Sequence, residues 1–184
     1  MAIKTMAKDV GVGQYNAGWH ELTISHAVDS EWNGKRVIDL NFEGYPETMR
    51  HRVFETVNKK TEEEFAIANL FRHACAGILN VLNDPTGKKP VIQYDDEVAN
   101  LVGTRVNAYF FKETSTTDGN EYSRIFDLIP VVQETEHLTW TADTVERLKR
   151  NVEKRHTKKT TANSGDLGTV SVETTTNSTA DIPF

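Results

Sequence analysis

The chain has 184 residues, 38% hydrophobic and 26% charged, values typical of one soluble globular domain with appendages. No apolar run reaches the length of a membrane span, and the N-terminus MAIKTMAKDVGVG lacks the apolar stretch of a signal peptide, so we expect a cytoplasmic protein. The single cysteine, Cys75, excludes an internal disulfide and a multi-cysteine zinc site, and its apolar neighbours predict a core position.

Charge is distributed unevenly along the chain, whose net charge is −6. Residues 1–142 carry 14 Lys and Arg against 21 Asp and Glu, residues 143–159 carry 7 against 3, and residues 160–184 carry none against 3. We therefore expect an acidic folded domain, a basic segment and an acidic tail. A simple polycation that coats nucleic acid is excluded, whereas a local basic patch that binds nucleic acid is not.

The first part of the domain predicts three strands. Residues 19–28, WHELTISHAV, alternate apolar and polar side chains as a half-buried strand does. Asn33-Gly34 is a strong hairpin signal, because both positions tolerate positive φ. The second strand spans residues 35–43 and the third spans residues 49–57. The second strand places three apolar side chains on one face: Ile38, Leu40 and Phe42.

The spacing of apolar residues then changes to that of a helix. Thr61 to Glu64 forms a capping box, which predicts a helix start. We predict one long helix over residues 65–83, ended by the Asn-Asp-Pro-Thr-Gly segment at residues 83–87. Its apolar stripe contains Phe65, Ala68, Phe71, Cys75, Ile78 and Leu82.

Two more strands complete the predicted domain. A short helical turn at residues 95–101 precedes strands at 104–113 and 122–132, which the turn TSTTDGN joins. The fourth strand places Val106, Ala108 and Phe110 on one face. Three strands, one helix and two strands match the OB-fold, a five-stranded and partly open barrel, although other α+β arrangements have the same order. We therefore predict a mainly β fold: a five-stranded OB-fold barrel with a long helix between strands 3 and 4.

The segment after the barrel is predicted to be a helix that docks on the barrel or a helix within a linker. Its narrow apolar stripe consists of Val145, Leu148 and Val152, and Asp143 with Glu146 can cap its start. From Thr160 onward the chain has no aromatic residue before its last position and no Lys or Arg, so we predict disorder there. The predicted parts are a DNA-binding domain at 1–142, a basic segment at 143–159 and an acidic tail at 160–184.

The sequence contains no recognisable arrangement of catalytic residues, metal ligands or cofactor-binding residues, so we do not expect an enzyme. The acidic triplet Asp95-Asp96-Glu97 could bind a metal, but a solvated start of a short helix is the simpler interpretation. A small metal-dependent nuclease of phage type would need clustered carboxylates with a lysine, and this pattern is absent from the sequence.

Aromatic and basic residues interleave at strand spacing, which favours single-stranded nucleic acid as a ligand. Bases stack on flat rings, and cations contact the backbone between them. Core packing is the competing interpretation for each strand aromatic. Trp32 is different, because it lies beside the Asn33-Gly34 turn, which flanks the ligand groove in an OB-fold. The predicted DNA-binding residues are Trp32, Lys35, Arg50, Arg52, Phe54, Arg105, Tyr109, Phe111, Tyr122 and Arg124.

The chain ends in Asp181, Ile182, Pro183 and Phe184. This ending resembles the C-terminal tip of bacterial single-stranded DNA-binding proteins, whose acidic tails close with the same four residues. Phe184 can enter an apolar pocket while its carboxylate and Asp181 meet basic residues of a partner. Pro183 limits the conformations that are lost on docking. The resemblance implies that the tip recruits replication and recombination proteins.

The layout as a whole resembles phage-encoded single-stranded DNA-binding proteins, which combine a diverged OB-fold with an acidic C-terminal tail. The segments LVGTRVNAYFFKE and NEYSRIFDLIPV are similar to the closing hairpin of that group. The resemblance implies a protein that coats and protects single-stranded DNA during phage replication, recombination and repair in an infected bacterial cell. A homo-oligomer is compatible with it. The alternative is an OB-like adaptor that binds proteins of the replication machinery and lacks strong DNA affinity.

Overall fold

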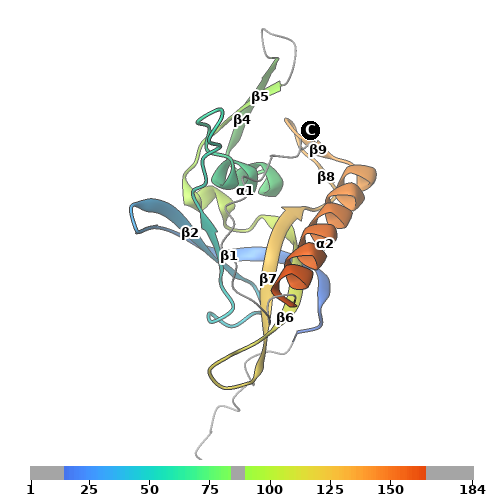
Figure 1. Ribbon diagram of the computed structural model, residues 1–184. Helices are drawn as coiled ribbons and strands as arrows, with labels where there is room; N and C mark the ends of the chain where they lie inside the picture. Colours follow the sequence, from blue (N-terminus) through green and yellow to red (C-terminus); the bar gives the residue numbers. More distant parts are fainter. Residues whose placement is uncertain (1–14, 84–89, 165–184) are drawn as a thin grey trace, which may run out of the picture.

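The structure is a computed structural model that describes residues 15–83 and 90–164. Its centre is a curved antiparallel sheet of five strands in the order β3-β2-β1-β6-β7, so the prediction of a mainly β fold is confirmed. The sheet does not close into a continuous ladder, because β3 and β7 form its two edges. The helices α1 and α2 and a separate ribbon of two strands surround the sheet (Figure 1).

The five strands of the sheet are β1 (Gly18–Trp32), β2 (Lys35–Phe42), β3 (His51–Phe54), β6 (Arg105–Thr114) and β7 (Glu121–Pro130). The other elements are α1 (Ala66–Ala74), β4 (Ile78–Asn83), β5 (Pro90–Tyr94), the 3-10 helix η1 (Val98–Leu101), β8 (Gln133–Glu134), β9 (Thr139–Trp140) and α2 (Ala142–Ser164). The five predicted strands and the predicted turn near residues 95–101 are thus present. No helix of the described residues is long and apolar enough to cross a membrane.

Strand β1 is shared by the two halves of the sheet. Residues 18–23 pair with β6, residues 24–32 pair with β2, and the register shifts between Ile24 and His26. At the other end, Asn33 and Gly34 have φ values of 53° and 75°, which is the backbone that a two-residue hairpin requires. The predicted hairpin is confirmed, and β1 runs four residues further toward it than the alternation indicated.

The inner face of the sheet, which packs on α1, holds the main core. The predicted inward-facing residues of β2 and β6 are buried there with Ile24 and the α1 residue Phe71: Ile38, Leu40, Phe42, Val106, Ala108 and Phe110. Burial of each large apolar side chain contributes about 1.5–3 kcal/mol to folding. The two-residue period of the strands therefore predicted the core correctly.

The prediction of one helix over residues 65–83 is wrong, because α1 ends at Ala74. Cys75 follows in the left-handed conformation with φ of 52°, and Gly77 has φ of 62°. The N–H groups of Cys75 and Ala76 donate to the carbonyls of Arg72 and Phe71, which completes a Schellman cap. The remainder of the predicted stripe, including Ile78 and Leu82, belongs to β4.

The predicted capping box is also corrected. The carboxylate of Glu64, and not the hydroxyl of Thr61, accepts hydrogen bonds at the start of α1. Its two oxygens lie 2.8 Å from the Ile67 nitrogen and 2.9 Å from the Ala68 nitrogen. The negative charge of Glu64 also suits the positive end of the helix dipole.

Strands β4 and β5 form a ribbon that projects from the main sheet (Figure 1). Its described residues carry no charged side chain, and Leu79, Leu82 and Val91 are exposed. At the base of the ribbon the Asp95 N–H donates to the Gly77 carbonyl at 2.8 Å. A Cβ atom at Gly77 would lie 2.2 Å from the Asp95 carbonyl oxygen, so only glycine fits there.

Two histidines attach the β7 edge to its neighbours. The His51 imidazole on β3 lies next to the Ile125 backbone and Asp127 of β7, and burial lowers the pKa of His51. The Nδ1 atom of His73 in α1 lies 3.1 Å from the Leu128 carbonyl. Burial, followed by the charge of Arg72, lowers the pKa of His73 to about 4. Both rings are therefore neutral near pH 7. His51 connects β3 to β7, and His73 connects α1 to β7.

Helix α2 docks on the outer face of β6 and β7 and lies beside β7 in Figure 1. Val145 and Val152 of the predicted stripe are buried in a second cluster with Ile129 and Trp140. The first turn is capped by the Thr141 hydroxyl, which accepts a hydrogen bond from the Thr144 N–H at 3.3 Å, in place of the predicted cap by Asp143 and Glu146. The helix continues to Ser164, so residues 160–164, which were predicted to be disordered, are helical.

Candidate nucleic-acid interface

Five of the predicted DNA-binding residues lie together on strands β1 to β3, on the outer face of the sheet that is turned away from α1. Residues that pair across antiparallel strands share a face. The strand registers supply three such pairs: Trp32 with Lys35, Phe54 with Val37, and Arg52 with Asp39. Arg50 lies just before β3, two residues from Arg52, and therefore on the same face. We call these five residues the outer cluster: Trp32, Lys35, Arg50, Arg52 and Phe54.

The centre of the outer cluster is a guanidinium group between two aromatic rings. The Arg52 Cζ atom lies 5.6 Å from the centre of the Trp32 ring and 6.0 Å from that of Phe54. Both distances lie within the range of cation–π attraction. The rings remain open to solvent, since Trp32 is 56% exposed and Phe54 is 42% exposed. The cluster therefore presents large flat surfaces on either side of a fixed cation.

Asp39 holds this guanidinium in place. Its two carboxylate oxygens accept hydrogen bonds from Arg52 at 2.8 and 2.9 Å, which is the bidentate arrangement of a strong ion pair. These bonds, with smaller effects of the charges of Arg52 and Arg50, lower the pKa of Asp39. Three cations and one carboxylate leave the cluster with a positive charge, and no ion pair of the described residues involves Lys35 or Arg50.

The predicted stacking residues Tyr109 and Phe111 lie on the outer face of β6 as expected, but α2 covers them. The His156 ring is centred 5.4 Å from the Tyr109 ring, 5.0 Å from the Phe111 ring and 5.0 Å from the Phe126 ring. Trp19 also packs against Tyr109 and donates a hydrogen bond to Glu153 of α2 at 2.8 Å. In this structure these rings attach a helix and are not part of the exposed cluster.

Arg105 lies on the outer face of β6. This strand is next to β1, which carries Trp32 of the outer cluster, and α2 packs on β6 and β7. Its guanidinium pairs with the Glu21 carboxylate at 2.8 Å, and both side chains are about half exposed. Exposed pairs of this kind contribute at most about 1 kcal/mol to stability. Arg105 therefore remains available to a phosphate, but it does not belong to the aromatic group.

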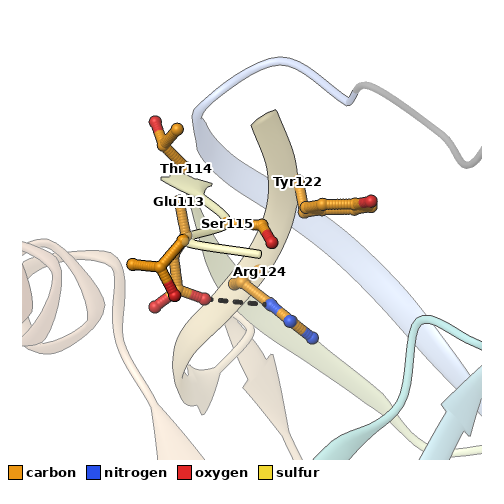
Figure 2. Close-up of a pocket in the computed structure, with 6 residues that line it drawn as sticks. Glu113, Thr114, Ser115, Tyr122 and Arg124 are labelled. Carbon is orange, nitrogen blue, oxygen red and sulfur yellow. Dashed lines mark hydrogen bonds and ion pairs between the residues drawn. The ribbon is translucent and has the colours of Figure 1, made fainter. Parts of the chain in front are cut away.

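Tyr122 and Arg124 lie apart from the outer cluster, at the β6–β7 hairpin. With Glu113, Thr114, Ser115 and Thr116 they line a shallow pocket (Figure 2). Arg124 Nε lies 3.2 Å from the Glu113 carboxylate. The Tyr122 hydroxyl donates to the Asp118 carboxylate, which lowers the pKa of Asp118 to about 2 and raises that of Tyr122. The structure thus separates the ten predicted residues into three groups and the single residue Arg105.

Sequence reasoning missed Asp39, which positions the central cation of the outer cluster. Its signal was the two-residue period, because Asp39 lies between the inward-facing Ile38 and Leu40 and must point outward. The four residues of the predicted partner-binding tip, 181–184, lie outside the described residues. Within the described ranges, no group of three His, Cys, Asp or Glu side chains could hold a metal ion.

No protein-family model matches the sequence, and a search of curated proteins found no match.

Proposed function

We propose that the chain is a single-stranded DNA-binding protein with a diverged OB-fold, and that the outer cluster is its primary DNA contact. The sheet order β3-β2-β1-β6-β7, with α1 between β3 and β6, is compatible with an OB-fold in which the β4–β5 ribbon is an insertion. OB-folds bind oligonucleotides on the face of strands 2 and 3 and in the adjacent loops. In such a fold, the outer cluster would occupy that position.

The observation on which the proposal depends is the exposed arrangement of Trp32, Arg52 and Phe54. An exposed indole and an exposed phenyl ring offer two faces for bases, and each stacked base contributes about 1–3 kcal/mol. Asp39 holds Arg52 through two hydrogen bonds, so little side-chain freedom is lost when DNA binds. Lys35 and Arg50 supply cations for the phosphates. Stacking on any base gives binding with little sequence preference, as a protein that coats DNA in replication, recombination and repair requires.

A titration with oligo-dT tests this function. Trp19 and Trp140 are packed against the helices, so the intrinsic fluorescence change should report mainly the exposed Trp32. We expect quenching on addition of oligo-dT, and an affinity that falls steeply with salt because phosphate contacts release counterions. Equal affinity for duplex DNA at moderate salt would contradict stacking. Absence of any binding to oligo-dT would favour the adaptor alternative.

We also propose that the tip, residues Asp181–Phe184, recruits host replication and recombination enzymes, because its four residues resemble the C-terminal tip of bacterial single-stranded DNA-binding proteins. Deletion of these residues should leave thermal stability and oligo-dT affinity unchanged or slightly raise the affinity, since one negative end is removed. It should abolish the pull-down of host proteins that bind such tails, and Phe184→Ala should have nearly the same effect. A truncated chain that loses DNA binding but keeps its partners would show that the tip serves the domain itself.

A further inference from the structure

Helix α2 has a second face that its docking on the sheet does not use. Val145 and Val152 point into the second apolar cluster, whereas a row of four basic residues lies on the opposite side of the helix. The row follows the helical spacing of three, four and four residues, so its members form one line about 16 Å long. All four side chains are exposed: Arg147, Arg150, Lys154 and Lys158. We call them the α2 stripe.

The other basic residues of α2 have partners on the protein, which distinguishes them from the α2 stripe. Lys149 pairs with Glu146 at 3.2 Å, and Arg155 pairs with Asp127 of β7 at 2.5 Å. Lys159 lies over the Phe126 ring at 5.8 Å. No ion pair of the described residues involves a member of the α2 stripe. Four cations without an ion-pair partner in the described ranges therefore line one helix in a chain whose net charge is −6.

We propose that the α2 stripe binds the sugar–phosphate backbone of single-stranded DNA and acts as a second contact surface in addition to the outer cluster. The inference rests on the proposed function, since it takes DNA as the ligand. The stripe has no aromatic residue, so it contacts phosphates and does not contact the bases. Helix α2 packs on the outer face of β6 and β7, and β1 connects these strands to β2 and β3, which carry most of the outer cluster.

An acidic protein partner fits the α2 stripe less well than a phosphate chain. Protein interfaces depend on buried apolar or aromatic anchors near their centre. The outward side of α2 offers none, because the exposed large apolar residues of the described chain all lie on other elements. A row of cations without apolar neighbours is instead the arrangement that recognises a phosphate backbone through counterion release.

The test is a salt-dependent titration of the full-length chain with oligo-dT. Replacing Arg147, Arg150, Lys154 and Lys158 by glutamine removes four charges and preserves helix propensity. If all four contact phosphates, the negative slope of log K against log salt should become less steep by about 3, because each contact to a single strand contributes about −0.7. The maximal quenching of Trp32 should remain as in the wild type, since the outer cluster is unchanged.

A matched pair of double variants separates the α2 stripe from a general loss of charge. Lys154→Gln with Lys158→Gln should make the negative slope less steep by about 1.4. Lys59→Gln with Lys60→Gln removes the same charge from the exposed β3–α1 connection and should leave the slope unchanged. Circular dichroism and thermal melting confirm that each variant is folded.

The outcomes distinguish this inference from the proposed function. A quadruple variant with wild-type affinity and slope would overturn the role of the α2 stripe, while quenching by oligo-dT would still support the outer cluster. A quadruple variant that keeps DNA binding but loses an acidic protein partner would also overturn it. Absence of quenching in the wild type would instead contradict the outer cluster and, with it, the proposed function.

Discussion

Replacing Trp32 and Phe54 together by alanine is expected to lower the affinity for oligo-dT by about 2–6 kcal/mol, since each stacked base contributes about 1–3 kcal/mol. The two rings flank Arg52 and are the exposed aromatic surfaces of the outer cluster. Because Trp32 is 56% and Phe54 is 42% exposed, the thermal stability should fall less than after a substitution in the core. Anisotropy of a labelled oligo-dT measures the affinity, as the variant lacks the reporting tryptophan.

Tyr109→Ala and Phe111→Ala are the matched aromatic controls. These rings pack against His156 under α2, so each substitution should lower the melting temperature and leave the affinity of the folded protein nearly unchanged. The opposite pattern would exclude the outer cluster as the DNA site. It would be seen if the variant at positions 32 and 54 bound normally while a folded Tyr109→Ala protein failed to bind.

Gly77→Ala is expected to destabilise the fold by about 2–5 kcal/mol. The left-handed backbone at φ of 62° costs a non-glycine residue about 1–2 kcal/mol. The added Cβ would also lie 2.2 Å from the Asp95 carbonyl oxygen, and relief of such overpacking costs about 1–3 kcal/mol more. Chemical denaturation with a fixed m-value measures the difference.

Gly44→Ala provides the control for Gly77→Ala. Gly44 has a similar φ of 76°, but a Cβ atom there would meet no atom within 4 Å. It should therefore show only the conformational cost of about 1–2 kcal/mol. Equal destabilisation by the two substitutions would show that the backbones at Gly77 and Asp95 can move apart to accept a Cβ atom.

The strands could be predicted from the sequence because their signals are local. The alternation in β2 and β6 identified the buried face, and Asn33-Gly34 identified the hairpin. The end of α1 was missed because the segment from Ile78 to Leu82 suits both a helical stripe and a strand, and short apolar runs of this kind are ambiguous by period alone. Gly77 was the available signal, since glycine often follows a helix end.

The candidate site was predictable only in part, for a different reason. The strand period placed Tyr109 and Phe111 correctly on the outer face, but it contains no information about which part of that face another element covers. The apolar stripe of Val145, Leu148 and Val152 predicted that α2 could dock on the sheet, but it did not predict where on the sheet. Docking depends on contacts between residues far apart in the chain, such as Trp19 with Glu153.

The closed base of the β4–β5 ribbon has a consequence for chain length. The Asp95 N–H meets the Gly77 carbonyl at 2.8 Å, so the chain leaves the main domain and returns to it at adjacent points. Residues added to or removed from the ribbon in facing pairs leave those two points where they are. In the terms of protein engineering, the length of the ribbon can change without a change in the five-stranded sheet.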